Sequence, residues 1–509
     1  MSIPDSSSGP ENTANGESAP ARLPPDDPRA SADKLTPLVA AAGFEDALKR
    51  LRLLKKLSLQ QQGQNASILD NLYMRSIETI EARLLTLPEM SLPIAAKYRQ
   101  LIRNMQDLLE TLARLLLNPT AKTDDASPKP EDNSLSPLAL WRALHLYSRH
   151  LFISSLTAAP PGTGIWKQLH HVYGLARQQG VTLDVPEKST HSIKDEYFAA
   201  ILLGCAQPTS FSSRDVFFLN RYLERFSEQV DTNIDDPAGN PVIFWINPES
   251  DTSATPYARK LPAAGTPVLN FSCRPLASLL ESQLAAVESG TPPKWINLPS
   301  FSATPAGLGV LNRLVHLLGK PDARRFPRRT QNYRGELCLG FDNLHQLYKK
   351  EHPPVKTSAW MITNESPDGY AVMHLSGKIQ AMVGDIAALR TETGDTWQLC
   401  IIRWALSENQ EHVELGLQIL ASRAYAADIV LPAQAEENTS HQPSLVLPVT
   451  PMLRQNETLI VPTGTLTEDS KNIVLIIERN NVEIREIGSI HCDERNGLIE
   501  LYEITSAWD

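Results

Sequence analysis

Four arginines stand within the six residues 324–329, which read Arg-Arg-Phe-Pro-Arg-Arg. Pro327 has a fixed backbone angle and no amide proton, so this segment cannot lie inside a helix. A guanidinium group is a planar fork of donors that pairs with phosphate or carboxylate through two hydrogen bonds. The segment therefore has the chemistry of an anion clamp, with four candidate residues, Arg324, Arg325, Arg328 and Arg329.

A second polar motif follows at residues 364–369, which read Asn-Glu-Ser-Pro-Asp-Gly. The amide of Asn364 can donate and accept, Ser366 has a rotatable hydroxyl, and Gly369 can take a positive φ close to a ligand. These are also the residue types that form turns, so a plain hairpin turn is the alternative interpretation. We expect Asn364, Ser366 and Gly369 to belong to the same binding site as the arginines.

The elements that must position these residues are strands. Six short runs of β-forming residues, separated by Gly, Asp and Asn, predict a small antiparallel barrel over residues 321–432; they lie at 336–341, 359–363, 370–375, 386–390, 397–404 and 413–420. After a polar break at 434–443, further strand patterns predict a β-rich C-terminal domain over 433–509. These patterns lie at 459–461, 473–477, 482–487 and 499–504.

The N-terminal half has a different pattern. Residues 1–34 are rich in Ser, Pro, Gly, Asp and Asn and predict a disordered tail. Apolar residues at three-and-four spacing then predict an all-helical region over 35–230, with a linker at about 118–133. Residues 231–320 give a mixed α/β pattern. The predicted fold is thus multidomain α+β: an all-helical region, a small antiparallel β-barrel and a further β-rich C-terminal region.

The order of these motifs and strands resembles a PilZ domain over about residues 321–430. Arg324 and Arg328 have the R-x-x-x-R spacing of that family, and Asn364, Ser366 and Gly369 match its second motif. Arg325 and Arg329 have the same spacing, so the register of the arginines stays open. The resemblance implies a site for cyclic di-GMP, with arginines on phosphate and guanine edges. Two features depart from the family pattern: Asn364 stands where Asp is more frequent, and a helix-like insertion spans 342–350.

The ligand implied by the resemblance suits the residues present. Cyclic di-GMP has two phosphate charges and two guanines, and the O6 and N7 acceptors of guanine suit an arginine fork. We therefore expect a cytosolic bacterial cyclic di-GMP effector, not an enzyme, whose helical region engages a protein partner. Control of motility, adhesion or exopolysaccharide is implied by the family alone. The alternative is a PilZ-like scaffold or adaptor that binds no nucleotide and acts through protein contacts.

Composition excludes several other classes. The net charge of −10 argues against a general nucleic-acid binder. Five dispersed cysteines, a polar N-terminus and no long apolar run predict a reduced cytoplasmic protein without membrane insertion. The histidines lack metal-ligand spacing, residues 160–167 lack the spacing of a phosphate loop, and no catalytic signature is found, so we expect no metal, cofactor or catalytic residue. Trp360 and Trp404 are expected in the barrel core.

Overall fold

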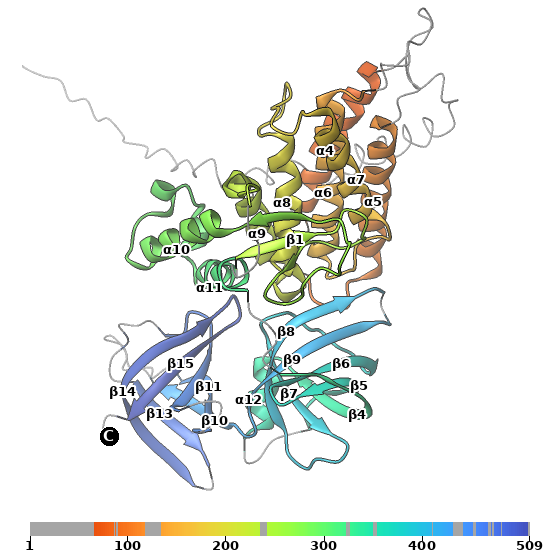
Figure 1. Ribbon diagram of the computed structural model, residues 1–509. Coiled ribbons are helices and arrows are strands. Elements are labelled where there is room, and N and C mark those ends of the chain that lie inside the picture. Colours follow the sequence, from red (N-terminus) through yellow and green to blue (C-terminus); the bar gives the residue numbers. More distant parts are fainter. Residues whose placement is uncertain are drawn as a thin grey trace, which may run out of the picture.

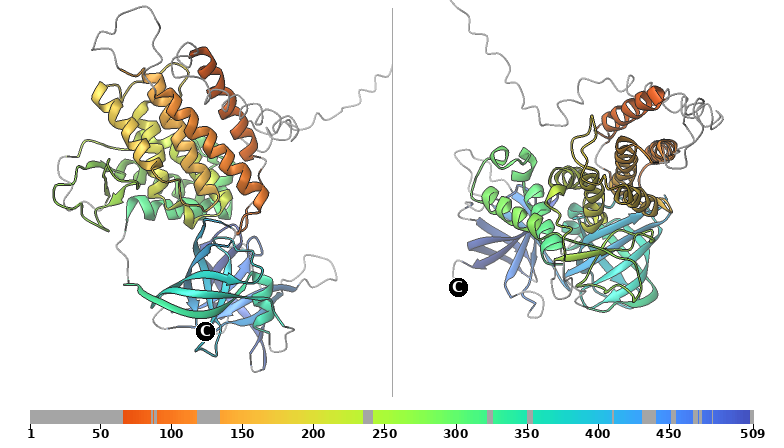
Figure 2. Two further views of the ribbon diagram at one scale, coloured as in Figure 1. Left: turned by 90° about the vertical axis from the view of Figure 1, so that its right-hand side faces the viewer. Right: turned by 45° about the horizontal axis from the view of Figure 1, so that its top comes forward.

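The protein is described by a computed structural model that covers residues 66–85, 87, 90–117, 134–234, 242–321, 326–349, 354–409, 411–430, 441–450, 455–466, 470, 473–479 and 481–506. The tail predicted over 1–34, the linker predicted over 118–133, and the candidate residues Arg324 and Arg325 lie outside the described residues. Figures 1 and 2 show a helical layer packed on two β-barrels that lie next to each other.

The helical layer is built around α6, which packs against α5, α7, α8 and α9. The α6 sequence is apolar on almost all sides, and its residues are buried along its whole length, as expected for a central helix. Side-chain caps begin several helices; for example, Ser212 accepts from the backbone of Asp215 at 3.2 Å. The predicted helical region is confirmed by helices α4 (Ala66–Leu85), α5 (Ala96–Leu116), α6 (Pro137–Leu156), α7 (Ile165–Gln179), α8 (Ile193–Cys205) and α9 (Ser213–Phe226).

The segment that follows is joined to the helices by one core. It holds a three-stranded antiparallel sheet in the order β2-β1-β3, and the ring of Phe271 on β3 lies 5.1 Å from that of Phe198 on α8. Residues 231–320 therefore do not pack as a separate unit, although their mixed pattern is as predicted. The elements are β1 (Ile243–Ile246), β2 (Thr255–Pro256), β3 (Leu269–Ser272), α10 (Arg274–Glu288) and α11 (Pro305–Leu314).

A closed six-stranded barrel comes next, with strand order β4-β5-β6-β9-β8-β7 and antiparallel neighbours. All six predicted strands are present, so the predicted barrel is confirmed. The helix-like insertion is the short helix α12 (Phe341–Leu347). The strands are β4 (Arg329–Leu339), β5 (Thr357–Ser366), β6 (Gly369–Ser376), β7 (Ile386–Thr391), β8 (Gln398–Ser407) and β9 (Val413–Ala421).

The C-terminal part is a second closed barrel with the order β10-β11-β12-β15-β14-β13. Counted within each barrel, the strand order is the same in both. The predicted boundary at 432 is wrong, because β10 (Tyr425–Val430) is the first strand of the second barrel. The remaining strands are β11 (His441–Leu447), β12 (Glu457–Pro462), β13 (Ile473–Glu478), β14 (Val482–Arg495) and β15 (Ile499–Ser506).

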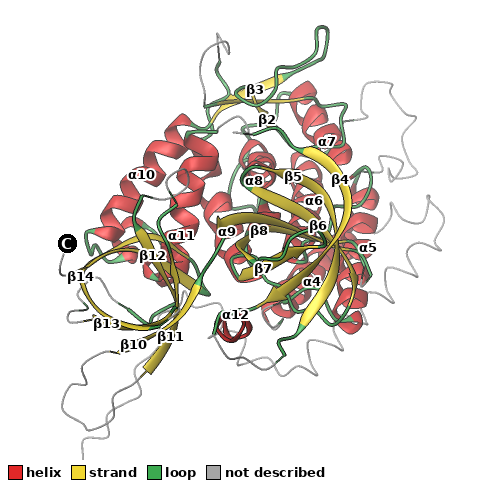
Figure 3. Cartoon of the chain, turned by 90° about the horizontal axis from the view of Figure 1, so that it is seen from below, coloured by secondary structure: helices red, strands yellow, loops and turns green. Residues whose placement is uncertain are grey.

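The two barrels share an apolar interface. Helix α12 contacts β4 and β7 of the first barrel and β10 and β11 of the second (Figure 3). Leu344 and Leu347 of α12 belong to one buried cluster with outward-facing residues of both barrels, such as Ile401 and Leu501. Burial of this kind is the main stabilising term between packed elements, so the two barrels form a continuous structure.

Inside the helical layer, a buried carboxylate lies between two histidines. Glu196 is 1% exposed, and its oxygens lie 3.1 Å from Nδ1 of His145 and 2.6 Å from Nε2 of His191. Trp141 stacks on His145 with ring centroids 5.1 Å apart. In the described parts of the chain, no cluster of His, Cys, Asp or Glu has the geometry of a metal site.

Among the described helices, none combines the length and apolar character needed to cross a bilayer.

Candidate functional site

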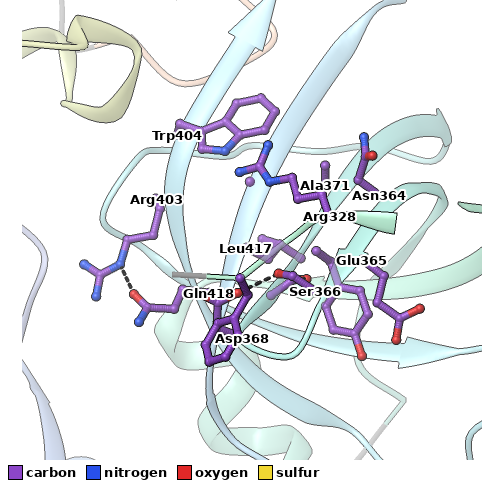
Figure 4. A pocket seen from close by; sticks show the side chains of 14 residues that line it. Arg328, Asn364, Glu365, Ser366, Asp368, Ala371, Arg403, Trp404, Leu417 and Gln418 are labelled. Atoms are coloured by element: carbon purple, nitrogen blue, oxygen red, sulfur yellow. Dashed lines mark hydrogen bonds between the residues drawn. The ribbon is translucent and has the colours of Figure 1, made fainter. Parts of the chain in front are cut away.

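A pocket of about 330 Å³ lies on the outer face of the first barrel (Figure 4). It brings together four of the residues expected from the sequence, namely Arg328, Asn364, Ser366 and Gly369. Arg329 begins β4, where it pairs with Glu365 in the strand register, and it does not line the pocket. The other lining residues are Phe326, Glu365, Asp368, Tyr370, Ala371, Arg403, Trp404, Gly416, Leu417 and Gln418.

The second motif is both a hairpin turn and a wall of the pocket. Ser366 at the end of β5 pairs with Gly369 at the start of β6, which leaves a two-residue turn. The Ser366 hydroxyl lies 2.6 Å from Oδ1 of Asp368 and 3.1 Å from the carbonyl oxygen of Gly369, and it donates to them. The two interpretations offered by the sequence are therefore compatible. The sequence analysis did not include Asp368, whose carboxylate can accept from the donor edge of a guanine.

Gly369 is needed for a different reason from the one expected. Gly369 does not have a positive φ angle, so the expectation of a left-handed backbone at this residue is wrong. Instead, β9 passes so close that a Cβ at Gly369 would lie 2.0 Å from the carbonyl oxygen of Leu417. A backbone atom cannot move aside as a side chain can, so any side chain here would separate β6 from β9.

We expect Gly369→Ala to lower the thermal unfolding midpoint of the protein by several degrees, because the substitution must break pairing between β6 and β9. A loss of about 2 kcal/mol, typical of overpacking, shifts the midpoint of a unit of about 150–250 residues, such as the two joined barrels, by roughly 4–8 °C. Differential scanning calorimetry measures it. The matched control is Gly174→Ala in α7, where a Cβ meets nothing within 4 Å and should be neutral or stabilising. Equal midpoints for wild type and Gly369→Ala would contradict the steric argument.

A β-bulge in β8 places two more side chains in the pocket. Ile402 pairs with Leu417 and Trp404 pairs with Gly416, so Arg403 is an extra residue on its strand. Because a bulge interrupts the alternation of side chains, Arg403 and Trp404 both line the outer pocket. The prediction that Trp404 lies in the barrel core is therefore wrong, whereas Trp360 is fully buried in that core, as predicted.

Gly416 makes room for the indole of Trp404. A Cβ on Gly416 would lie 1.8 Å from Nε1 of Trp404. The indole can therefore lie flat over the backbone of β9, and in Figure 4 the guanidinium of Arg328 points toward it. An aromatic face next to a guanidinium is an arrangement on which a nucleobase can stack.

Arg403 is held by polar partners from two barrels. Its Nε donates to Oε1 of Gln418 on β9 at 2.5 Å, and its Nη2 donates to Oε2 of Glu494 on β14 at 2.8 Å. A second bond joins Nη1 to Oε1 of Glu494. Sequence reasoning missed this arginine, because only the pairing of β8 with β9 shows that a bulge turns it outward.

The pocket also has acidic groups on one side. Glu365 lines it and accepts hydrogen bonds from Gln331 Nε2 at 3.1 Å and from the Tyr333 hydroxyl at 3.2 Å. Burial and the charge of Glu365 raise the pKa of Tyr333, so this phenol keeps its proton and acts as the donor. The site thus offers cations for phosphate and carboxylates for guanine donors.

The strand that carries Arg403 and Trp404 continues into the helical layer. At the end of β8, the amide of Ser407 donates to the carbonyl of Ala158, which follows α6, at 2.9 Å. A second junction pairs Leu92, which precedes α5, with Ala381 of the first barrel through backbone bonds of 2.9 and 3.0 Å. The pocket strand β8 is therefore hydrogen-bonded directly to the helical layer, and the second junction joins that layer to another part of the same barrel.

Comparison with known proteins identifies the barrel. Residues 346–425 match the family described as "Cyclic-di-GMP receptor FimW, middle PilZ domain". The first barrel contains a PilZ domain. In this PilZ domain the matched range includes the hairpin motif at 364–369 and the bulge in β8, and it begins after the arginine segment. The expected resemblance to PilZ proteins is thus confirmed.

Two further matches extend beyond the PilZ barrel. Residues 20–237 match "Cyclic-di-GMP receptor FimW, N-terminal domain", a range that includes helices α4 to α9. The chain is also 21% identical over 419 residues to the curated Cyclic-di-GMP receptor FimW of Pseudomonas aeruginosa, covering 66% of this chain and 67% of that protein. These matches relate the helical region and the PilZ barrel to the same group of receptors.

Proposed function

We propose that this PilZ protein is a cyclic di-GMP receptor that binds the nucleotide in the pocket on β5, β6, β8 and β9. The observation that carries the proposal is that Arg328, Asn364 and Ser366, chosen from sequence alone, line one pocket. Arg328 would bind phosphate or the O6 and N7 edge of a guanine. Asn364 and Asp368 would bind other base edges, and Trp404 offers a face for stacking.

We further propose that binding is transmitted to the helical layer, which acts on a protein partner. Support comes from β8, which has Arg403 and Trp404 at the pocket and Ser407 at the junction with Ala158. A ligand that shifts the bulge would shift the strand end that is bonded to the helices. Such coupling requires a difference in binding free energy between two arrangements of this strand.

The place and output of this receptor are also proposals. None of the described cysteines forms a disulfide bond, and four of the five are buried, which suits the reducing cytoplasm. Control of motility, adhesion or exopolysaccharide is proposed from the presence of a PilZ domain. Neither a catalytic role nor a bound cofactor is needed for a receptor of this kind.

The test is calorimetric titration of the full chain with cyclic di-GMP. We expect saturable binding with one site, or with two ligands if the nucleotide binds as a stacked pair, and a raised unfolding temperature. GTP serves as the control, because it has more phosphate charge but only one guanine. Equal affinity for GTP would mean that the pocket is a general anion site. Absence of heat and of any thermal shift would favour the adaptor function, in which the helical layer alone does the binding.

A further inference from the structure

One arginine of the pocket is already occupied by another part of the protein. Arg403 lines the pocket, yet all three of its guanidinium nitrogens already donate hydrogen bonds. Nε donates to Gln418, and Nη1 and Nη2 donate to the two carboxylate oxygens of Glu494. Glu494 belongs to β14 of the second barrel. The guanidinium that could serve as a second fork for the ligand is therefore held by a group outside the PilZ barrel.

The geometry of this pair is that of a phosphate contact. An arginine and a carboxylate form two parallel bonds, and a phosphate presents its oxygens in the same way. The ligand proposed above has two phosphates and two guanines in equivalent halves, whereas Arg328 supplies only one fork from the described wall of the pocket. A second fork at Arg403 would match the second half of the ligand.

The pair is open enough to be exchanged. The side chains of Arg403 and Glu494 are each 30% exposed, and pairs that water reaches are weak because solvent screens them. A ligand with two negative charges can compete with a single carboxylate for such a guanidinium. Gln418 would keep its bond to Nε and hold the group in place during the exchange.

We propose that Arg403 is a ligand-binding arginine of this pocket and that Glu494 of the second barrel competes with the nucleotide for it. This inference rests on the proposed function. We call the Arg403–Glu494 pair the latch. Ligand binding opens the latch, and the C-terminal barrel thereby sets the affinity of the PilZ barrel for its nucleotide.

The turn that holds Glu494 touches other parts of the protein. A register shift between Cys492 and Glu494 turns β14 at this point. Next to it, the Asn496 side-chain amide donates to the carbonyl of Gly384 in the first barrel at 2.9 Å. The carbonyl of Arg495 lies against α11, where a Cβ on Gly309 would be only 2.4 Å away. Opening of the latch would therefore move a turn that contacts both the first barrel and the helical layer.

Besides Arg403, a second arginine, Arg313 on α11, lies near Glu494. Burial and the charge of Arg403 lower the pKa of Arg313 on α11 to about 10, and the charge of Glu494 opposes that effect. Arg313 is anchored by a 2.6 Å bond to the carbonyl of Ser210. When Arg403 turns to the ligand, Glu494 keeps a positive neighbour, which lowers the cost of the exchange.

The test is Glu494→Gln in the full chain, titrated with cyclic di-GMP in parallel with wild type. Removing the competing charge should raise the affinity about fivefold, the amount expected from a partly exposed ion pair. Glu486→Gln, an exposed carboxylate on the same strand, is the matched control and should leave the affinity unchanged. Arg403→Ala should weaken binding, and in that background Glu494→Gln should have no further effect.

The direction in which Glu494→Gln changes the affinity for cyclic di-GMP distinguishes competition from positioning by Glu494. Weaker binding by Glu494→Gln would mean that Glu494 positions Arg403 for the ligand, and it would overturn the competition. Unchanged binding next to a binding wild type would overturn the latch and leave the receptor function intact. Absence of binding in both proteins would overturn the receptor function and the latch with it. As a second readout, ligand should speed hydrogen exchange at residues 493–497 in wild type, and unchanged exchange would contradict an opening turn.

Discussion

Replacement of Arg328 by alanine is expected to lower the affinity for cyclic di-GMP about 100-fold while leaving the barrel folded. Arg328 is the one motif arginine of the segment that both lies in the described part of the chain and lines the pocket. Hydrogen bonds to charged groups contribute about 1.5–3 kcal/mol, and a lost fork at the upper end corresponds to roughly two powers of ten. Calorimetric titration gives the affinity, and far-UV circular dichroism checks the fold.

Two further arginines make this experiment specific. Arg334→Ala is the matched control, because Arg334 is exposed on β4, the strand that begins directly after Arg328, and does not line the pocket. Arg329→Ala decides the register left open by the sequence. If Arg329→Ala abolishes binding and Arg328→Ala does not, the arginines bind in the other register and the assignment of Arg328 is wrong.

Replacement of Glu196 by alanine is expected to cost about 3 kcal/mol in the free energy of unfolding, because it removes a buried carboxylate that is the partner of two partly buried histidines. Glu196 also lies in the first turn of α8, where the helix dipole favours a negative charge. Denaturant unfolding followed by circular dichroism measures the change. Glu187→Ala, at an exposed position, is the control. A loss no larger than that of the control would show that the network has no structural role.

The same network predicts a pH dependence. Burial lowers the pKa of His191, but the hydrogen bond and charge of Glu196 outweigh it and raise the pKa above the usual 6.5. A raised pKa stabilises the folded state below about pH 6.5, and this contribution is lost as the pH rises through the folded value. For Glu196 the balance of burial and the two histidines lowers the pKa, so its contribution is lost only in acid. Between pH 6 and 9 the unfolding free energy of wild type should therefore fall relative to that of Glu196→Ala, and a constant difference between the two proteins would contradict the role of Glu196.

The sequence predicted the first barrel well because its strands are separated by clear turn residues. Of the six strands of the second barrel, the sequence predicted the last four and missed β10 and β11. Its strand β10 has Asp428 in the middle, and β11 contains Pro443 and is apolar only toward its end. Both features weaken a strand pattern. Such strands are defined by their pairing with each other, which a single sequence does not show.

The site was predicted in its local motifs and missed where it depends on tertiary structure. Asn364, Ser366 and Gly369 lie in one hairpin, so their spacing was enough to identify them. Arg403 and Trp404 enter the pocket through a bulge whose effect depends on the register with β9. The contact with Glu494 joins residues 91 positions apart, on two different barrels, and no local pattern indicates it.

The shared apolar interface under α12 limits how this protein can be dissected. A fragment that ends before β10 would leave Leu344, Leu347 and their neighbours facing water, and exposed patches of that kind promote aggregation. The same cut would also remove Glu494. Ligand affinities obtained from an isolated PilZ barrel would therefore describe a different receptor, and comparative assays should keep both barrels on one polypeptide.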